Sequence, residues 1–325
     1  MIDKNGKKSP LVSVLVITYN QENYLRQALD SILMQKVNFS YEILIGDDHS
    51  KDKTPDILKE YSEKYPDIIR LYLRDKNLGA SRNAYDLLMK CKGSYLAFCE
   101  GDDYWISPYK LQKQVDFLEN HKEYIGCAHK CLIINEKGET EKNQKLSWIK
   151  QKRIFQFKDF KGIFLPGQTA TIVKRNIFLD DKTEYDILYK IHPHISDRVS
   201  TLLYLLNGKF YCIKEVLSVY RKVISENADN VTSKTYKQCI NKVFDELKYT
   251  EDLENYATRF LKRKIIFKFY RKDLYCYAII NLLKKPNKEN INNIIKLHKI
   301  PKMPKLSILH LPIYILRKIY IKLPF

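Results

Sequence analysis

The sequence predicts an α/β fold, a mostly parallel β-sheet with helices on both faces, followed by a basic helical C-terminal region. Between residues 11 and 99, short apolar runs alternate four times with amphipathic segments, a pattern typical of parallel sheets. A polar cluster follows each apolar run, at the edge where such sheets bind ligands. From residue 259 onward, 17 lysines and arginines stand against two acidic residues, a net charge of +15 out of +19 for the chain. We therefore expect an α/β domain at residues 1–225 and a separate region at residues 226–325.

The first two strands are expected at residues 11–17 and 41–45. Residues 11–17 are almost all apolar and rich in β-branched side chains, which fits a strand covered on both faces. This run ends at Thr18-Tyr19-Asn20, and residues 24–33 follow with apolar side chains at helical spacing. The second run ends at Asp47-Asp48. Thr54-Pro55 then begins a helix that extends to about residue 65.

The third and fourth strands are expected at residues 68–73 and 94–99, with the turn at Asn77 and a helix at 82–90 between them. The fourth strand leads directly into Glu100-Gly101-Asp102-Asp103. Three carboxylates this close repel one another at the edge of a buried sheet unless a cation lies among them. Mg²⁺ and Mn²⁺ prefer such oxygen ligands, so the motif predicts a metal that holds a diphosphate. The alternative is an acidic turn that caps the next helix.

Several classes of protein are disfavoured by motif and composition. The sequence has no GxGxxG after the first strand and no GxxxxGK[ST], so it matches neither a dinucleotide-binding unit nor a P-loop enzyme. The seven cysteines form no CxxC pair and predict reduced thiols in a cytosolic protein. Residues 1–10 are polar and predict no signal peptide, and no stretch of about 18 apolar residues predicts a membrane-spanning helix.

The C-terminal region mixes cationic residues with large apolar ones, especially at 260–272 and 306–325. Basic amphipathic segments of this kind suit an anionic membrane surface. A helical subdomain with a solvated basic face is the alternative. Nucleic-acid binding would fit the charge, but the chain carries no recognisable nucleic-acid-binding motif.

Together these motifs resemble the bacterial family 2 glycosyltransferases, which have the GT-A fold and transfer a sugar from a nucleotide-diphosphate sugar with inversion. The resemblance covers residues 11–221. Glu100 stands where the family more often has aspartate. The motifs that carry the resemblance are Thr18-Tyr19-Asn20, Gly46-Asp47-Asp48-His49-Ser50, Asn77-Leu78-Gly79, and Glu100 to Trp105 with Pro108, Lys110, Leu111 and Gln114.

The resemblance assigns roles by position. The metal, Mn²⁺ or Mg²⁺, would be held by Asp102 and Asp103. The expected residues of the nucleotide-sugar site are Thr18, Tyr19, Asn20, Asp48, Asn77, Asn83, Asp102 and Arg221. The residues assigned to the acceptor side are Trp105, Gln168, Thr169 and His194. His192 and His194 could also form a metal pair, which the family position disfavours.

Asp197 is the expected catalytic base. Apolar residues at helical spacing follow it and Gly208 ends that helix, so a plain N-cap is the alternative reading. In the resembling family an acidic residue at this place accepts the proton of the acceptor hydroxyl, before a strand that ends in Tyr-Arg. Tyr220-Arg221 matches that ending. A cap and a base can be the same residue.

We therefore expect a metal-dependent inverting hexosyl- or N-acetylhexosaminyltransferase. It would move a sugar from a UDP-type donor to a lipid-linked glycan of a capsule, O-antigen or similar surface polysaccharide. It would work in the cytoplasm, peripherally at the inner face of the cell membrane. One alternative is a non-catalytic scaffold that binds membrane or RNA through its basic region. A nucleotidyltransferase is disfavoured because residues 18–22 form no glycine-rich basic loop. The oligomeric state is left open, a homo-oligomer included.

Overall fold

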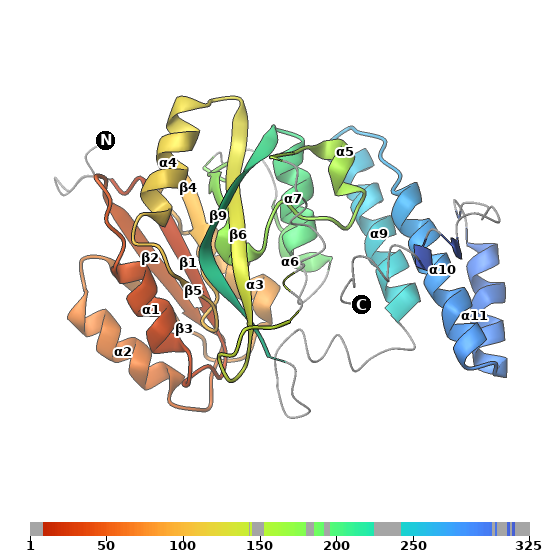
Figure 1. Ribbon diagram of the computed structural model, residues 1–325, viewed down its shortest axis with the longest axis horizontal. Helices are drawn as coiled ribbons and strands as arrows, with labels where there is room; N and C mark the ends of the chain where they lie inside the picture. The colour runs from red at the N-terminus through yellow and green to blue at the C-terminus, as the bar shows by residue number, and fades with distance from the viewer. Residues whose placement is uncertain are drawn as a thin grey trace.

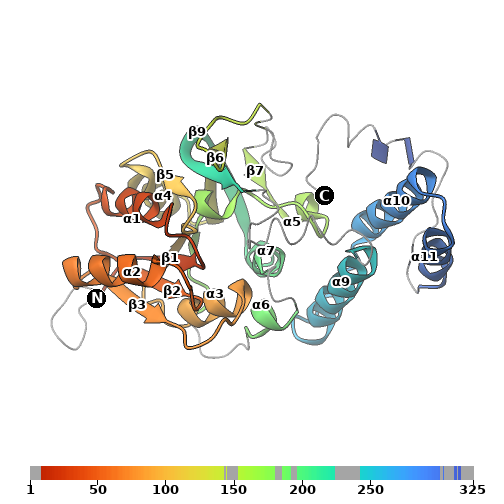
Figure 2. The same ribbon diagram turned by 90° about the horizontal axis from the view of Figure 1, so that it is seen from below.

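The computed structural model describes residues 9–142, 144, 153–179, 185–191, 196–223, 242–300, 303, 311–312 and 314–315, except the side chains of residues 242 and 289. A large β-sheet crosses the α/β part of the molecule, and helices cover both of its faces (Figure 1). Three C-terminal helices extend away from one side of this body (Figure 2). The predicted fold class is confirmed.

The four predicted strands form a parallel block in the order β3-β2-β1-β4. Each is short and largely apolar, and the loops after β1, β2 and β4 lie at one edge of the sheet. Their bounds are β1 (Val12–Thr18), β2 (Tyr41–Asp47), β3 (Ile69–Leu73) and β4 (Tyr95–Phe98).

Beyond β4 the sheet becomes mixed. Strand β8 (Val173–Arg175) pairs antiparallel with β4 and with β6 (Tyr124–Asn135). The long strand β9 (Lys209–Lys222) runs parallel to β6, and β5 (Tyr104–Trp105) and β7 (Ile154–Phe155) pair antiparallel with it. Since β5 directly follows the acidic motif, its pairing with β9 fixes that motif against a strand more than 100 residues later.

Two apolar cores lie on the two faces of the sheet, as the alternation of side chains along β1 shows. Val14 and Val16 belong to one core, and Leu15 belongs to the other. The core of the valines is covered by α1 (Leu25–Leu33), α2 (Thr54–Lys64) and α4 (Lys110–Asn120). The core of Leu15 is covered by α3 (Ala80–Leu88), α7 (Asp197–Leu205), α9 (Lys242–Arg259) and α10 (Lys268–Lys284). Shorter elements are α5 (Phe157–Phe160), η1 (Thr169–Thr171) and α6 (Ile187–Lys190).

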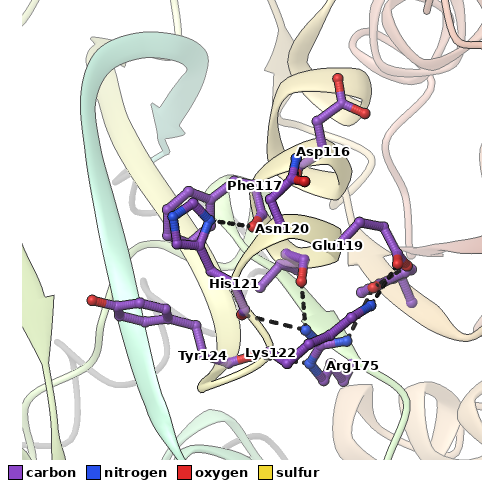
Figure 3. Close-up of polar contacts among 10 residues, drawn as sticks. Asp116, Phe117, Glu119, Asn120, His121, Lys122, Tyr124 and Arg175 are labelled. Carbon is purple, nitrogen blue, oxygen red and sulfur yellow. Dashed lines mark hydrogen bonds and ion pairs between the residues drawn. The ribbon is translucent and has the colours of Figure 1, made fainter.

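Arg175 holds the end of α4 against the sheet (Figure 3). Its Nη2 donates to the carbonyl of Leu118 at 2.6 Å and its Nε to the carbonyl of Tyr124 at 3.0 Å. Nη1 donates to the hydroxyl of Tyr95 at 3.0 Å. A cation is favourable at a helix C-terminus, where backbone carbonyls have no partner within the helix. These hydrogen bonds join the end of β8 to the end of α4 and to β4.

The C-terminal helices α9, α10 and α11 (Lys288–Lys299) continue from the core that contains Leu15 (Figure 1). Phe267, just before α10, packs its ring edge-on against Phe160 at 5.5 Å between centroids. None of the helices in the described part of the chain combines the length and apolar character that crossing a bilayer requires. Phe267 and buried side chains of α9 and α10 belong to the core that contains Leu15, so this part of the C-terminal region packs against the α/β domain.

Candidate active site at the carboxyl edge of the sheet

Backbone hydrogen bonds join the loops that follow β1, β2 and β4. The N–H of Asp48 donates to the carbonyl of Thr18 at 3.0 Å, and the N–H of Gly101 donates to the carbonyl of Ile17 at 3.2 Å. Parallel strands place their carboxyl ends at one edge, and these bonds fix the three loops there side by side. The structure therefore brings together the polar clusters that the sequence predicted to converge.

The carboxylate of Asp48 fixes the turn after β3. Its Oδ1 accepts from the N–H of Leu78 at 2.7 Å and its Oδ2 from the N–H of Gly79 at 2.9 Å. Asn77 returns a bond to the carbonyl of Asp48 at 3.1 Å. Gly79 has φ +84°, a left-handed conformation that favours glycine. Asp48 and Asn77 thus lie together: the Asp48 side chain bonds the backbone of Leu78 and Gly79, and the Asn77 side chain bonds the backbone of Asp48.

Asn83 lies behind these loops. Its side chain is buried, donates to the carbonyl of Gly46 at 2.8 Å and accepts from Nε of Arg74 at 3.0 Å. A Cβ atom at position 46 would lie 2.4 Å from Oδ1 of Asn83, so only glycine fits there. Through its bond to Gly46, Asn83 therefore helps to hold the loop that contains Asp47 and Asp48.

The predicted loop of Thr18, Tyr19 and Asn20 lies at the surface of this edge. Asn20 has φ +52°, its N–H donates to Ser50 Oγ at 2.8 Å, and its Oδ1 accepts from the N–H of Lys51 at 2.8 Å. Tyr19 is half-buried and Asn20 is exposed. The buried Thr18 Oγ1 has no hydrogen-bond partner among the residues that the structure describes. This hydroxyl is thus buried and unpaired beside Gly101 of the acidic motif.

Asp103 points into the protein. It is 1% exposed, and it accepts hydrogen bonds from Gln168 Nε2 at 2.6 Å and from the N–H of Arg221 at 2.9 Å. The Arg221 side chain donates to the carbonyl of Asp102 at 3.1 Å and to Gln27 Oε1 at 2.9 Å. Both carboxylate oxygens of Asp103 thus accept hydrogen bonds from protein donors, whereas Asp102 is half-buried at the edge of the sheet.

The other two carboxylates of the motif are half-buried at the same edge. Burial and, to a smaller extent, the charges of Asp102 and Asp197 raise the pKa of Glu100 to about 8. Burial also raises the pKa of Asp102 to about 6. A cation here would relieve this repulsion, so Glu100 and Asp102 fit a divalent metal in charge and donor type. Within the described ranges, no group of three or more His, Cys, Asp or Glu residues is arranged to hold a metal ion.

Asp197 begins α7, and its charge raises the pKa of Glu100 in the acidic motif. Its side chain is exposed, and Oδ1 accepts from the N–H of Arg198 at 2.7 Å. Partial desolvation by the protein around it raises the pKa of this carboxyl, although the side chain remains open to solvent. A carboxylate that is accessible and has a raised pKa suits proton transfer from a hydroxyl group.

The residues assigned to the acceptor side have different positions. Trp105 is 1% exposed, and its indole N–H donates to the carbonyl of Ala170 at 3.0 Å, so we correct its assignment from an acceptor contact to a core residue. Gln168 bonds Asp103 and also approaches Glu100, with 3.4 Å between Nε2 and Oε2. Thr169 is half-buried at the start of η1. His192 and His194 lie outside the described residues.

Sequence reasoning missed Lys174 on β8. Its Nζ donates to Ser200 Oγ at 2.8 Å and lies 4.3 Å from the ring centroid of Tyr204. Burial lowers the pKa of this amine to about 7, and the charge of Asp197 partly offsets the effect. The sequence around Lys174 gives no local signal of this kind, because its partners Ser200 and Tyr204 are on α7, more than 20 residues later.

The comparison with protein families agrees with this arrangement. The model of the family described as "Glycosyl transferase family 2" matches residues 13–180, more than half of the chain. The chain therefore belongs to glycosyltransferase family 2.

Relatives are found in bacteria. The chain is 36% identical over 212 residues to an uncharacterised protein of Mycobacterium tuberculosis, covering 65% of this chain and 58% of that protein. The chain thus spans less than two thirds of the length of the first curated relatives it matches. It is 38% identical over 109 residues to the putative teichuronic acid biosynthesis glycosyltransferase TuaG of Bacillus subtilis, covering 34% of this chain and 42% of TuaG.

Solved structures share the fold. Residues 1–349 of S. aureus TarS, solved with UDP-GlcNAc, superpose with a TM-score of 0.52 at 18% identity, covering 89% of this chain and 90% of that one. At this identity the likeness shows the fold alone.

Proposed function

We propose that this chain transfers a sugar from a nucleotide-diphosphate sugar to a glycan acceptor, with inversion at the anomeric carbon. The observation that carries the proposal is the convergence of the loops after β1, β2 and β4 at one edge of the sheet, where Glu100 and Asp102 lie, in a chain of glycosyltransferase family 2. An inverting transfer also requires a base, and we assign this role to Asp197, whose charge raises the pKa of Glu100.

In the proposed reaction, Asp197 accepts the proton of the acceptor hydroxyl as that oxygen attacks the anomeric carbon. The new glycosidic C–O bond forms while the bond to the diphosphate oxygen breaks, and the nucleoside diphosphate leaves from the opposite face. Thr18, Tyr19 and Asn20 would line the nucleoside site. Asp48 would act on the nucleoside through the turn at Leu78 and Gly79, which its carboxylate holds. The free hydroxyl of Thr18 supports this assignment.

A divalent metal, Mn²⁺ or Mg²⁺, fits this site through Asp102, with Glu100 as a neighbouring carboxylate. When bound, the metal would supply positive charge to the leaving diphosphate. Asp103 would instead hold Gln168 and β9 in place, as its hydrogen bonds indicate. Arg221 would act through the backbone of Asp102 and less through direct contact with phosphate.

We infer a UDP-type donor because TarS, which has the same fold, was solved with UDP and with UDP-GlcNAc. The chain is also 33% identical over 232 residues to the minor teichoic acid biosynthesis protein GgaB of Bacillus subtilis. The names of TuaG and GgaB support an acceptor in surface-polysaccharide synthesis. We therefore propose a hexosyl- or N-acetylhexosaminyltransferase that acts on a lipid-linked glycan.

The C-terminal helices support a position at the cytoplasmic face of a membrane. Leu283, Ile291 and Ile295 are exposed large apolar side chains on α10 and α11. Lys284 and Lys288 lie next to them in the chain and are also exposed. Apolar side chains among lysines are typical of a surface that binds anionic lipid. The alternative is a non-catalytic scaffold, which would bind a membrane or RNA through this surface and would not need the carboxylates of the site.

Release of UDP from a panel of UDP-sugars, with and without a glycan acceptor, tests the proposal. Asp197→Asn should abolish release and leave donor binding intact. Asp56→Asn is the matched control, because Asp56 is also in the first turn of a helix but lies 79% exposed on α2. Full activity of Asp197→Asn would overturn the proposed role of Asp197, and full activity in EDTA would overturn the role of the metal.

A further inference from the structure

An ion pair joins the helix of Asp197 to the C-terminal helices. Arg198 on α7 places Nη1 2.6 Å from Oε2 of Glu246 on α9. The two side chains are 13% and 8% exposed, so the pair is largely removed from water. The hydroxyl of Tyr270 on α10 donates to the same Oε2 at 2.5 Å. Three helices therefore meet at one carboxylate.

Aromatic rings surround this pair. The guanidinium of Arg198 lies 5.5 Å from the ring centroid of Tyr249 and 5.3 Å from that of Tyr270. Rings at these distances attract a cation and also exclude water from it. Since a charge in such a place is stable only with its partner, Arg198 is restricted to one position.

That restriction reaches Asp197, the residue before Arg198. The N–H of Arg198 donates to Asp197 Oδ1, so the backbone of residue 198 sets where the carboxylate lies. The charge of Arg198 lowers the pKa of Asp197, and the charge of Glu246 raises it. The other charged or titratable groups that interact with Asp197 are Glu100 after β4, Lys174 on β8 and Tyr249 on α9.

We propose that Glu246 is a positioning residue for Asp197. By holding Arg198, it fixes the first turn of α7 and compensates the positive charge beside the catalytic carboxylate. This inference rests on the proposed function, in which Asp197 is the base. It makes the C-terminal region a part of the catalytic machinery, in addition to any role at a membrane.

The same two helices offer a matched control. Arg271 on α10 and Glu254 on α9 form a second ion pair at 2.9 Å, and their side chains are 0% and 2% exposed. Glu254 also accepts from the N–H of Phe267 at 2.9 Å. Among the residues that the structure describes, the side chains of this pair bond only within α9 and α10 and to Phe267, so its loss should weaken the helices without changing Asp197.

The experiment compares Glu246→Gln with Glu254→Gln in the full chain, with steady-state UDP release measured across pH. For Glu246→Gln we expect kcat to fall about tenfold or more, with the KM for the donor unchanged. We also expect the acid limb of the kcat profile to move to lower pH, because a negative charge that raises the pKa of Asp197 is removed. Glu254→Gln should keep the wild-type profile, measured per folded molecule.

Amide hydrogen exchange at residues 198–200 gives a readout that needs no turnover. Exchange there should rise in Glu246→Gln and, more weakly, in Tyr270→Phe, which keeps the ion pair. If Glu246→Gln does not fold, Tyr270→Phe is the variant that tests the inference. Equal profiles and equal exchange in Glu246→Gln and Glu254→Gln would overturn the inference. If Asp197→Asn retained turnover, the proposed function would fail, while the exchange result would still decide whether Glu246 holds α7.

Discussion

The carboxylate of Asp103 accepts a hydrogen bond at 2.9 Å from the backbone N–H of Arg221, a residue 118 positions later in the chain. With the bond from Gln168 to its other oxygen, Asp103 joins the acidic motif, η1 and β9 into one unit. The adjacent Asp102 remains half-buried at the edge of the sheet. Two neighbouring aspartates therefore lie in different environments, and we expect substitutions at the two positions to have different effects.

Asp103→Asn should destabilise the fold. The new amide group would place an N–H₂ against the N–H₂ of Gln168, and Gln168 cannot turn without losing its bond to the N–H of Ala170. We expect the free energy of unfolding to fall by about 1–3 kcal/mol, measured by urea denaturation. Asp102→Asn, the control, should cost little because a partly buried charge is removed. An unchanged free energy of unfolding in Asp103→Asn would contradict the anchoring role.

Asp102→Asn should remove metal-dependent donor binding while the fold remains intact. The substitution deletes the carboxylate charge that we propose for the metal and leaves the backbone carbonyl that Arg221 contacts. Calorimetric titration with UDP and Mn²⁺ should show at least about a tenfold loss of affinity, as expected for the loss of one strong charged contact. Asp116→Asn, on the exposed face of α4, is the control. Unchanged affinity would mean that other groups hold the metal or that none is bound.

His129 should make stability depend on pH. It is 1% exposed, and burial lowers its pKa from 6.5 to about 3. Below pH 6.5 the unfolded chain binds a proton that the folded chain does not, so the free energy of unfolding falls as the pH falls. The loss from this residue should be about 1 kcal/mol between pH 6.5 and 5.5. Urea denaturation of His129→Gln should show a shallower pH dependence, and an identical dependence in both proteins would refute this account.

The apolar residues of α11 should contribute to lipid binding. Ile291 and Ile295 are exposed and four residues apart, so they lie on one face of the helix. Replacing both by asparagine should reduce sedimentation with vesicles that contain anionic phosphatidylglycerol, because about 1.5–3 kcal/mol per buried side chain is lost. Binding that depends on Lys284 and Lys285 but not on these isoleucines would assign the region to electrostatic attraction alone.

Much of the fold could be predicted because its signals are local. Four apolar runs with polar ends specify β1 to β4, and the loops that follow them converge by the geometry of a parallel sheet. Trp105 was assigned to the wrong environment, since a tryptophan beside a polar motif can point to either side, and only the distant carbonyl of Ala170 shows which. Lys174, Gln168 and Glu246 likewise depend on partners far along the chain, which no local pattern encodes.

The central claim is that this edge of the sheet binds a nucleotide-sugar donor through a metal. The most direct measurement is a thermal-shift screen of the purified chain against UDP, GDP, CDP and dTDP, each with Mn²⁺ and with EDTA. A ligand that binds only the folded state raises the melting temperature. We predict a shift with UDP and Mn²⁺ that disappears in EDTA and in Asp102→Asn. A folded sample that shows no shift with any nucleotide would contradict the claim and favour the scaffold.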